Sequence, residues 1–176
     1  MDVYFLRHAN AGEARLDPTK DEKRPLDKLG IAQSHNMGRA LAALDVTVDA
    51  IISSPLRRAT QTATVVANEI GYEEKVVLDA ALRSQATYEE FQELLRRHSR
   101  KEAILVVGHN PSMTEFVNKL LAGEAASPVI EMKKGAIAKI EVGRRQAILK
   151  WYVPPKVVGS IQQASASNSR PKTVSK

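Results

Sequence analysis

Two histidines and one arginine stand at the ends of apolar segments of this chain, and their side chains could bind phosphate and react with it. Arg7 and His8 follow the apolar run 3–6, and His109 follows the apolar run 103–107. Arginine offers a planar set of N–H donors that suits phosphate oxygens, and histidine can act as nucleophile, base or acid near neutral pH. An Arg-His pair is common in proteins, so its meaning depends on the partners that the rest of the chain supplies.

Alternating strand and helix patterns predict how these residues are positioned. Apolar, β-branched runs predict strands over residues 3–6, 49–53, 76–78 and 103–107. Helices are predicted over 27–44, after Ser54-Pro55, after Thr87 and after Asn110-Pro111. Residues 136–142 and 147–152 flank a turn and predict a hairpin. Three strand–helix units followed by a hairpin predict an α/β three-layer sandwich, with a mostly parallel central sheet and an antiparallel edge.

Several local details follow from the same patterns. Ser54 is expected to be the N-cap of its helix, and Ser112 to start a capping box with Glu115. Ile31, Ser34, Gly38 and Leu41 are expected to share one face of helix 27–44. Residues 10–28 are polar and rich in charge, which predicts a long loop of the kind that is functional or mobile.

Parallel strands would bring three strand–helix junctions to one edge of the sheet. The first junction carries Arg7 and His8, the second Arg57 and Arg58, and the third His109. Open α/β sheets bind ligands outside the carboxyl ends of their strands, and helix N-termini favour anions there. Since no acidic residue stands at these junctions, the sequence predicts an anion site, with phosphate as the natural ligand.

The three junctions together resemble the signature of the histidine phosphatase superfamily. The segments are Leu6-Arg7-His8, Ser54-x-x-x-Arg58-Ala59-x-Gln61-Thr62 and Gly108-His109, in that order over roughly residues 1–152. The resemblance implies a phosphoglycerate-mutase-like fold and a nucleophilic His8 that becomes transiently phosphorylated. It also implies that Arg7, Arg58 and a protonated His109 hold the phosphoryl oxygens, and that no metal or other cofactor is required.

One departure from the superfamily's pattern bears on the substrate. Mutases and phosphomonoesterases of the superfamily typically carry an acid after the second helix, whereas here residues 80–88 hold no carboxylate and Asp79, Glu89 and Glu90 are the nearest. A histidine nitrogen leaves phosphorus more readily than an alcohol oxygen, so it has less need of an acid.

Arg24-Pro25-Leu26 resembles a loop of the small protein-phosphohistidine phosphatases of the SixA type, in which such an arginine borders the site. That resemblance implies that Arg24 binds substrate and that the substrate is phosphohistidine on a protein, such as a histidine phosphotransfer domain. Arg24 could equally be a solvated arginine beside Glu22 and Lys23.

The overall composition narrows the remaining possibilities. The net charge is +6, but residues 154–176 contribute +4 of it, so residues 1–153 are nearly balanced and form the expected catalytic domain. The basic stretch 154–176 is expected to be a disordered tail. Its four positive charges are too few to indicate nucleic-acid binding, which usually needs a clustered basic face. No apolar run is long enough to cross a membrane, no secretory signal is visible and there is no cysteine, so we expect a cytoplasmic monomer.

Two other functions stay open from the sequence. One is a phosphatase of small phosphate esters or sugar phosphates. The other is an inactive module that binds phosphoproteins without turnover. The presence of His8, Arg58 and His109 together argues against it, because a binding module has no need of a nucleophile.

Overall fold

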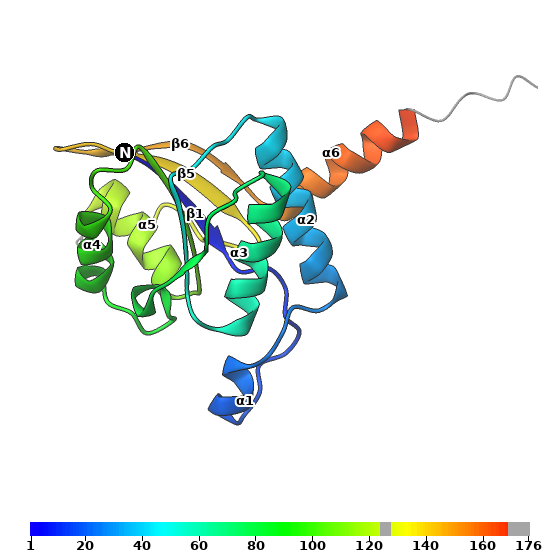
Figure 1. The fold of residues 1–176 in the computed structure, drawn as a ribbon, viewed down its shortest axis with the longest axis horizontal. Helices are drawn as coiled ribbons and strands as arrows, with labels where there is room; N and C mark the ends of the chain where they lie inside the picture. The colour runs from blue at the N-terminus through cyan, green and yellow to red at the C-terminus, as the bar shows by residue number, and fades with distance from the viewer. Residues whose placement is uncertain (124–127, 169–176) are drawn as a thin grey trace, which may run out of the picture.

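A six-stranded mixed sheet forms the centre of the structure, a computed structural model that describes residues 1–123 and 128–168 (Figure 1). The strand order is β3-β2-β4-β1-β5-β6. The first four strands in that order pair in parallel, and β5 and β6 add an antiparallel edge. The strands are β1 (Asp2–Arg7), β2 (Ala50–Ser53), β3 (Val77–Leu78), β4 (Ala103–Gly108), β5 (Ile137–Val142) and β6 (Ala147–Val153). The predicted α/β class, parallel sheet and edge hairpin are confirmed.

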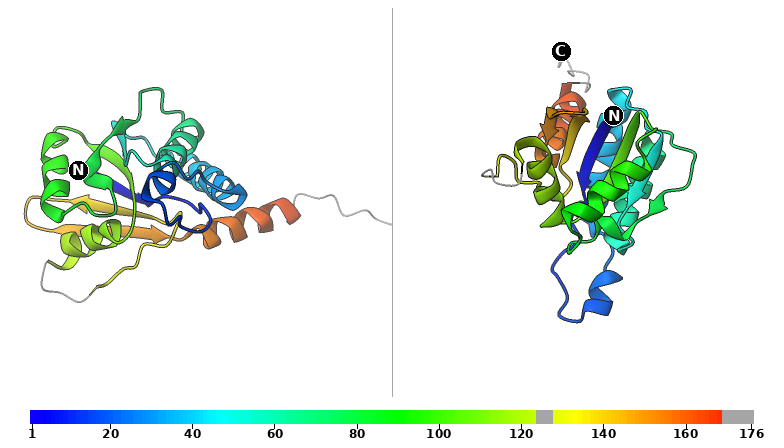
Figure 2. Two further views of the ribbon diagram at one scale, coloured as in Figure 1. Left: turned by 90° about the horizontal axis from the view of Figure 1, so that it is seen from below. Right: turned by 90° about the vertical axis from the view of Figure 1, so that its left-hand side faces the viewer.

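Helices cover both faces of this sheet, which makes three layers (Figures 1 and 2). Alternate residues of the apolar strand β1 point to opposite faces, so Val3 and Phe5 join one core cluster while Tyr4 and Leu6 join the other. The helices are α1 (Pro18–Glu22), α2 (Lys28–Ala43), α3 (Arg57–Glu69), the short 3-10 helix η1 (Ala80–Leu82), α4 (Tyr88–Arg97), α5 (Ser112–Ala122) and α6 (Pro155–Asn168).

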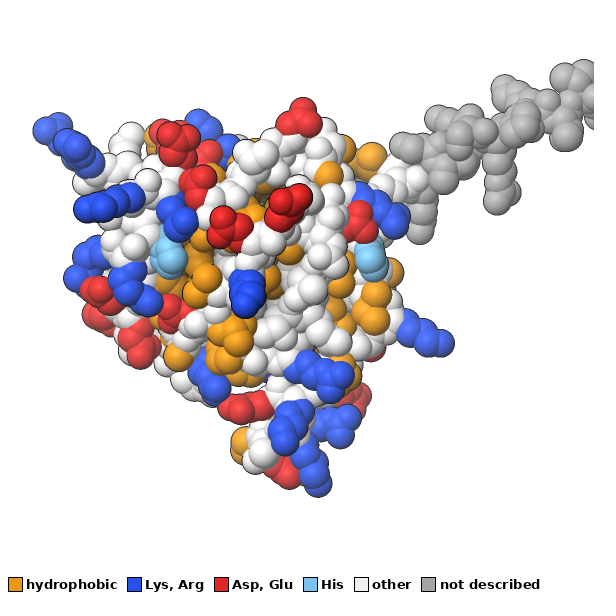
Figure 3. Space-filling model, in the orientation of Figure 1, with side chains coloured by type: hydrophobic (Ala, Val, Ile, Leu, Met, Phe, Trp, Pro, Cys, Tyr) orange, Lys and Arg blue, Asp and Glu red, His pale blue; other side chains and the backbone are white. Residues whose placement is uncertain are grey.

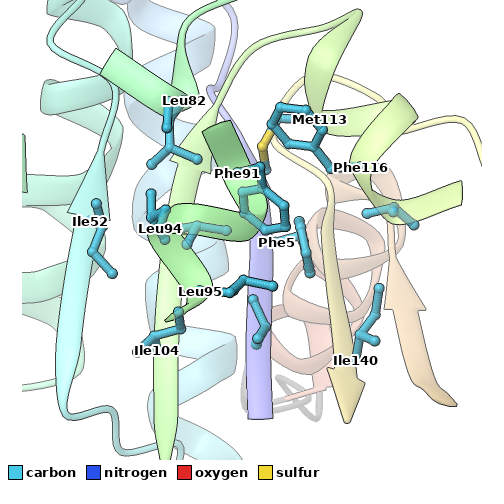
Figure 4. Packing of buried hydrophobic residues seen from close by; sticks show 14 of the residues in the cluster. Phe5, Ile52, Leu82, Phe91, Leu94, Leu95, Ile104, Met113, Phe116 and Ile140 are labelled. Carbon is cyan, nitrogen blue, oxygen red and sulfur yellow. The ribbon is translucent and has the colours of Figure 1, made fainter. Parts of the chain in front are cut away.

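The core on the α4 and α5 side is built around three phenylalanines (Figure 4). Phe91 of α4 stacks on Phe116 of α5 at 4.6 Å between ring centroids and lies 5.4 Å from Phe5 of β1. The capping box predicted at Thr87 is present and fixes the start of α4. Packed helices on this face hold the end of β4, and with it His109, in place.

One residue of α2 differs from the sequence prediction. Ser34, Gly38 and Leu41 are buried as one face, but Ile31 is 43% exposed because Gly30 and Met37 complete that face instead. The close approach of Gly30 explains this difference, since a Cβ there would lie 1.8 Å from the carbonyl oxygen of Asn10. The segment before α2 therefore packs directly against the helix backbone.

The expected disorder from residue 154 onward is wrong for Pro155–Asn168, which form α6. Val158 is buried against the cluster that includes Met37 and Leu41 of α2, and the Gln162 Nε2 donates to the Asn36 carbonyl oxygen at 3.2 Å. Val158 docks this segment, whereas Val157 and Ile161 stay 47% and 62% exposed. Residues 169–176 lie outside the described residues. Within the described part of the chain, no helix has the length and apolar character needed to span a membrane.

Candidate active site

The carboxyl ends of the three neighbouring strands β1, β4 and β2 bring His8, His109 and Ser54 together. The backbone N–H of His8 donates to the Gly108 carbonyl oxygen at 3.0 Å, and that of Ser54 donates to the Val107 carbonyl oxygen at 2.9 Å. These bonds continue the sheet register one residue beyond each strand. As a result the rings of His8 and His109 lie 4.8 Å apart between centroids.

His8 is buried, at 5% exposure, and its tautomer is fixed by the backbone. Its Nδ1 lies 2.7 Å from the Ala9 carbonyl oxygen, which can only accept, so Nδ1 carries the proton. Burial, together with the positive charges of Arg58, Arg7 and Lys134, lowers the pKa of His8 to about 3. The ring is therefore neutral at pH 7, with a free lone pair on Nε2.

Burial favours the neutral form of His109 as well, and the protonated form expected on a bound phosphoryl group stays a prediction. Burial, His8, Arg58 and Arg7 lower its pKa to about 2. Its Nε2 lies 2.9 Å from the Ser54 Oγ, and its buried Nδ1 has no hydrogen-bond partner among the described residues. With Ser54 donating to Nε2, the proton of His109 would sit on Nδ1, where it is available to a ligand.

Arg7 and Arg58 are held by one end of the guanidinium while Nε stays unpartnered. The Arg7 Nη1 donates to the Met132 carbonyl oxygen at 2.8 Å. The Arg58 Nη1 donates to the Asp21 carbonyl oxygen at 2.9 Å and lies 3.2 Å from the Asp21 Oδ2. Burial lowers the pKa of both guanidinium groups, which still remain charged. Arg58 is 6% exposed, whereas Arg57, the arginine not chosen from the sequence, is exposed.

Three buried side-chain nitrogens in the described part of the chain lack any hydrogen-bond partner: the Nε atoms of Arg7 and Arg58 and the Nδ1 of His109. Buried polar atoms are almost always paired, so three unpaired nitrogens from one set of neighbouring residues indicate a ligand rich in acceptors. Two of them belong to cations, which favours an anion. No group of three or more potential metal-ligating side chains occurs among the residues described.

Comparison with known proteins identifies the family. The sequence model of the histidine phosphatase superfamily (branch 1) matches residues 3–87. This chain belongs to the histidine phosphatase superfamily. An uncharacterized protein of Picosynechococcus is 32% identical over 146 residues, which cover 81% of this chain and 86% of that protein. Membership in the superfamily supports phosphatase activity.

Two solved structures show what the fold is similar to. The protein histidine phosphatase SixA complexed with tungstate matches with a TM-score of 0.78 at 25% identity, over 90% of this chain and 99% of that one. The alpha-ribazole phosphatase of Shigella flexneri matches with a TM-score of 0.70 at 18% identity, over 88% of this chain and 97% of that one. The second likeness concerns the fold alone.

The contacts of Arg58 bring to the candidate site an acid that the sequence did not single out, Asp21. It belongs to α1, which lies within the segment 10–27 between β1 and α2; we call this segment the strap (Figure 1). The Asp21 Oδ1 accepts from the Arg24 Nε at 2.8 Å and from the Arg15 N–H at 2.9 Å. The hydrogen bond from Arg24, the Arg15 N–H and the charge of Arg58 lower the pKa of Asp21 to about 2. Asp21 therefore holds Arg58 as a carboxylate.

Arg24 links the two ends of the strap by hydrogen bonds to other strap residues. Its side chain is buried, and its Nη1 donates to the carbonyl oxygens of Ala11 at 2.7 Å and Gly12 at 3.2 Å. The alternative that Arg24 is a solvated loop arginine is therefore wrong. It reaches the site through Asp21, which it shares with Arg58; direct contact with substrate stays a prediction.

Lys134 is a second residue at the site that the sequence did not single out. Its Nζ donates to the Asn10 Oδ1 at 3.2 Å, and its charge contributes to the low pKa of His8. The neighbouring Gly135 N–H donates to the Arg7 and His8 carbonyl oxygens. The turn Lys133-Lys134-Gly135 could have indicated Lys134 in the sequence. It directly precedes β5, the strand that pairs with β1.

The predicted capping roles of Ser54 and Ser112 are wrong. Helix α3 begins at Arg57 with no side-chain cap, and the Ser54 Oγ contacts His109 instead. Helix α5 likewise has no side-chain cap, and the Ser112 Oγ donates to the carbonyl oxygens of Arg83 and His109. Both hydroxyl groups position the His109 segment rather than a helix N-terminus.

The acids nearest to the expected general-acid position are engaged elsewhere. Asp79 caps η1 through the Ala81 N–H at 2.9 Å and pairs with Arg97 at 2.7 Å. Glu90 closes the capping box of α4, and Glu89 is an exposed residue in the same first turn. These contacts account for all three carboxylates without any role at the site.

Proposed function

We propose that this protein is a phosphatase that removes phosphate from phosphohistidine on proteins through a covalent intermediate on His8. The observation that supports the proposal best is the group of three unpartnered nitrogens around a neutral His8 whose Nδ1 is tied to the backbone. That arrangement leaves the His8 Nε2 as the one nucleophilic atom of this ring. Neutral imidazole attacks phosphorus without the help of a base.

In the first step the His8 Nε2 forms a bond to phosphorus and the P–N bond of the substrate breaks. The Nε–H groups of Arg7 and Arg58 and the Nδ1–H of His109 donate to the three equatorial oxygens, over which the charge of the transferring group is spread. The substrate imidazole leaves as a neutral ring when its second nitrogen already carries a proton. Water then attacks phospho-His8, which releases inorganic phosphate and restores the lone pair on Nε2.

The state of the acids favours a nitrogen leaving group over an alcohol. Asp21 contacts Arg58 at the site, and with a pKa of about 2 it is ionised. Glu131, whose charge acts on Arg7, is exposed and also has a lowered pKa, mainly through Lys133. An alkoxide leaving group needs a proton in the transition state, and a general acid typically accelerates that step by about 100-fold to 10,000-fold. Asp21 is poorly suited to supply it. A phosphatase of small esters or sugar phosphates is the second candidate, because the superfamily's fold also occurs in the alpha-ribazole phosphatase.

A leaving-group series separates these two candidates. We expect hydrolysis of free phosphohistidine and of aryl phosphates, whose phenolate leaves easily, and we expect alkyl phosphates to react at least about 100-fold more slowly. His8→Asn abolishes turnover of every substrate, whereas the matched variant His98→Asn, on the distant end of α4, retains it. Alkyl esters hydrolysed as fast as phosphohistidine would show that the protein has a general acid and would refute the phosphohistidine assignment. Full activity of His8→Asn would refute the mechanism.

A further inference from the structure

A hollow of about 620 Å³ opens beside the strap, next to the site but outside the groups that would hold phosphate. Its walls come from three elements: Glu22 and Lys23 of the strap, Arg57 and Thr60 at the start of α3, and Val76 and Leu78 at β3. We call it the docking hollow. We propose that it receives an acidic surface of the phosphorylated protein substrate, an inference that rests on the proposed function.

The docking hollow carries positive charge that the protein itself does not neutralise. Lys23 and Arg57 are both exposed, and neither takes part in an ion pair among the residues described. Glu22, the acid in the wall, pairs with Arg83 at 2.6 Å. The hollow therefore presents two free cations that a partner's carboxylates can approach.

Four of the five acids of the strap bond to other groups of the protein, Glu22 through its pair with Arg83, whereas Glu13 is exposed. Asp17 caps α1, Asp21 pairs with Arg24 and Arg58, and Asp27 caps α2. Basic side chains gather over the projection that α1 forms in the space-filling view (Figure 3). Because complementary charge steers association and fixes orientation, a partner with acidic residues around its phosphohistidine fits this surface.

The position and the apolar wall of the hollow favour a protein over a small metabolite. The Arg58 Nη1 donates to the carbonyl oxygen of Asp21, which precedes Glu22 and Lys23, so one contact between α1 and α3 joins the wall of the hollow to the site. Leu78 is 56% exposed on the two-residue edge strand β3. Cationic and apolar groups side by side are typical of protein interfaces.

The test compares one protein substrate with one small substrate. The protein is a histidine phosphotransfer domain of acidic sequence, phosphorylated with potassium phosphoramidate, and the small substrate is free phosphohistidine. For the double variant Lys23→Glu/Arg57→Glu we expect kcat/KM on the phosphoprotein to fall by about tenfold or more, mainly through KM. On free phosphohistidine we expect kcat/KM to stay within about twofold, since the phosphate-holding groups are unchanged.

The control Arg144→Glu/Arg145→Glu makes the same charge change in the exposed β5–β6 turn and should leave both activities unchanged. Thermal melts of every variant show whether it is folded. The milder double variant Lys23→Ala/Arg57→Ala removes the two charges without reversing them, so it tests docking even if the glutamate variant does not fold. An equal loss on both substrates, or no loss on the phosphoprotein, would overturn the docking proposal. Wild-type activity on free phosphohistidine without activity on the phosphoprotein would overturn it while leaving the chemistry of His8 intact. Activity on neither would refute the proposed function and the docking proposal with it.

Discussion

His8 and His109 should make the stability of this fold depend on pH within a defined window. Their pKa values are lowered to about 3 and about 2, while an unfolded histidine titrates near 6.5. Both groups are thus neutral when folded and take up protons on unfolding. Their contribution to stability is complete above pH 6.5 and is lost progressively as the pH falls from 6.5 toward 3.

The size of the effect follows from the number of protons. Each histidine lowers the free energy of unfolding by up to about 1.36 kcal/mol per pH unit inside that window. Between pH 7.0 and 5.5 the two together should lower it by about 2.5 kcal/mol. Half of this dependence, about 1.2 kcal/mol, should disappear in His8→Asn and half in His109→Asn.

The assay is urea unfolding at pH 7.0, 6.0 and 5.5, followed by far-UV circular dichroism and by fluorescence of the single tryptophan, Trp151. Subtracting each variant's pH dependence from that of the wild type cancels the contributions of the other titrating groups. Variants with the same pH dependence as the wild type would refute the conclusion that both rings are buried in the neutral form.

Other predictions concern the strap and its anchors. Asp21→Asn should lower stability by about 1 kcal/mol at pH 7, after allowance for solvent screening, and this loss should vanish as the pH falls from about 4 through 2, where the wild-type carboxylate is protonated. The same variant should lower kcat on free phosphohistidine because Arg58 loses its anchor, and unchanged kinetics would contradict that role. Gly30→Ala should lower stability by about 3 kcal/mol in thermal melts, because its Cβ would meet the Asn10 backbone. Gly159→Ala, whose Cβ meets nothing within 4 Å in α6, should be neutral or stabilising, so equal melting temperatures for the two alanine variants would contradict the packing argument.

The convergence of the histidines was predictable because it depends on strand order alone. Continuous apolar runs mark strands buried on both faces, and parallel neighbours end at one edge, so His8 and His109 had to meet. The choice of Arg58 over Arg57 came from the resemblance and agrees with burial, since Arg58 lies on the buried face of α3 beside Ala59 and Thr62.

Contacts between loops were not predictable from the sequence. The strap holds five acids without periodicity, and nothing in it distinguishes Asp21 as the partner of Arg58. The Ser54 hydroxyl matched a helix-cap pattern, but its partner His109 stands 55 positions away. Helix α6 was not predicted because the composition of residues 155–168 is polar and rich in serine. Its docking on α2 depends mainly on one residue, Val158.

The most direct test of the account is to trap the phosphoenzyme. The wild-type protein is mixed with phosphorylated phosphotransfer domain, quenched in alkali to preserve phosphohistidine, and analysed by mass spectrometry and ³¹P NMR. We expect one phosphoryl group on the His8 Nε2, absent in His8→Asn and present in His98→Asn. Phosphate on His109, or release of inorganic phosphate by His8→Asn at the wild-type rate, would contradict it.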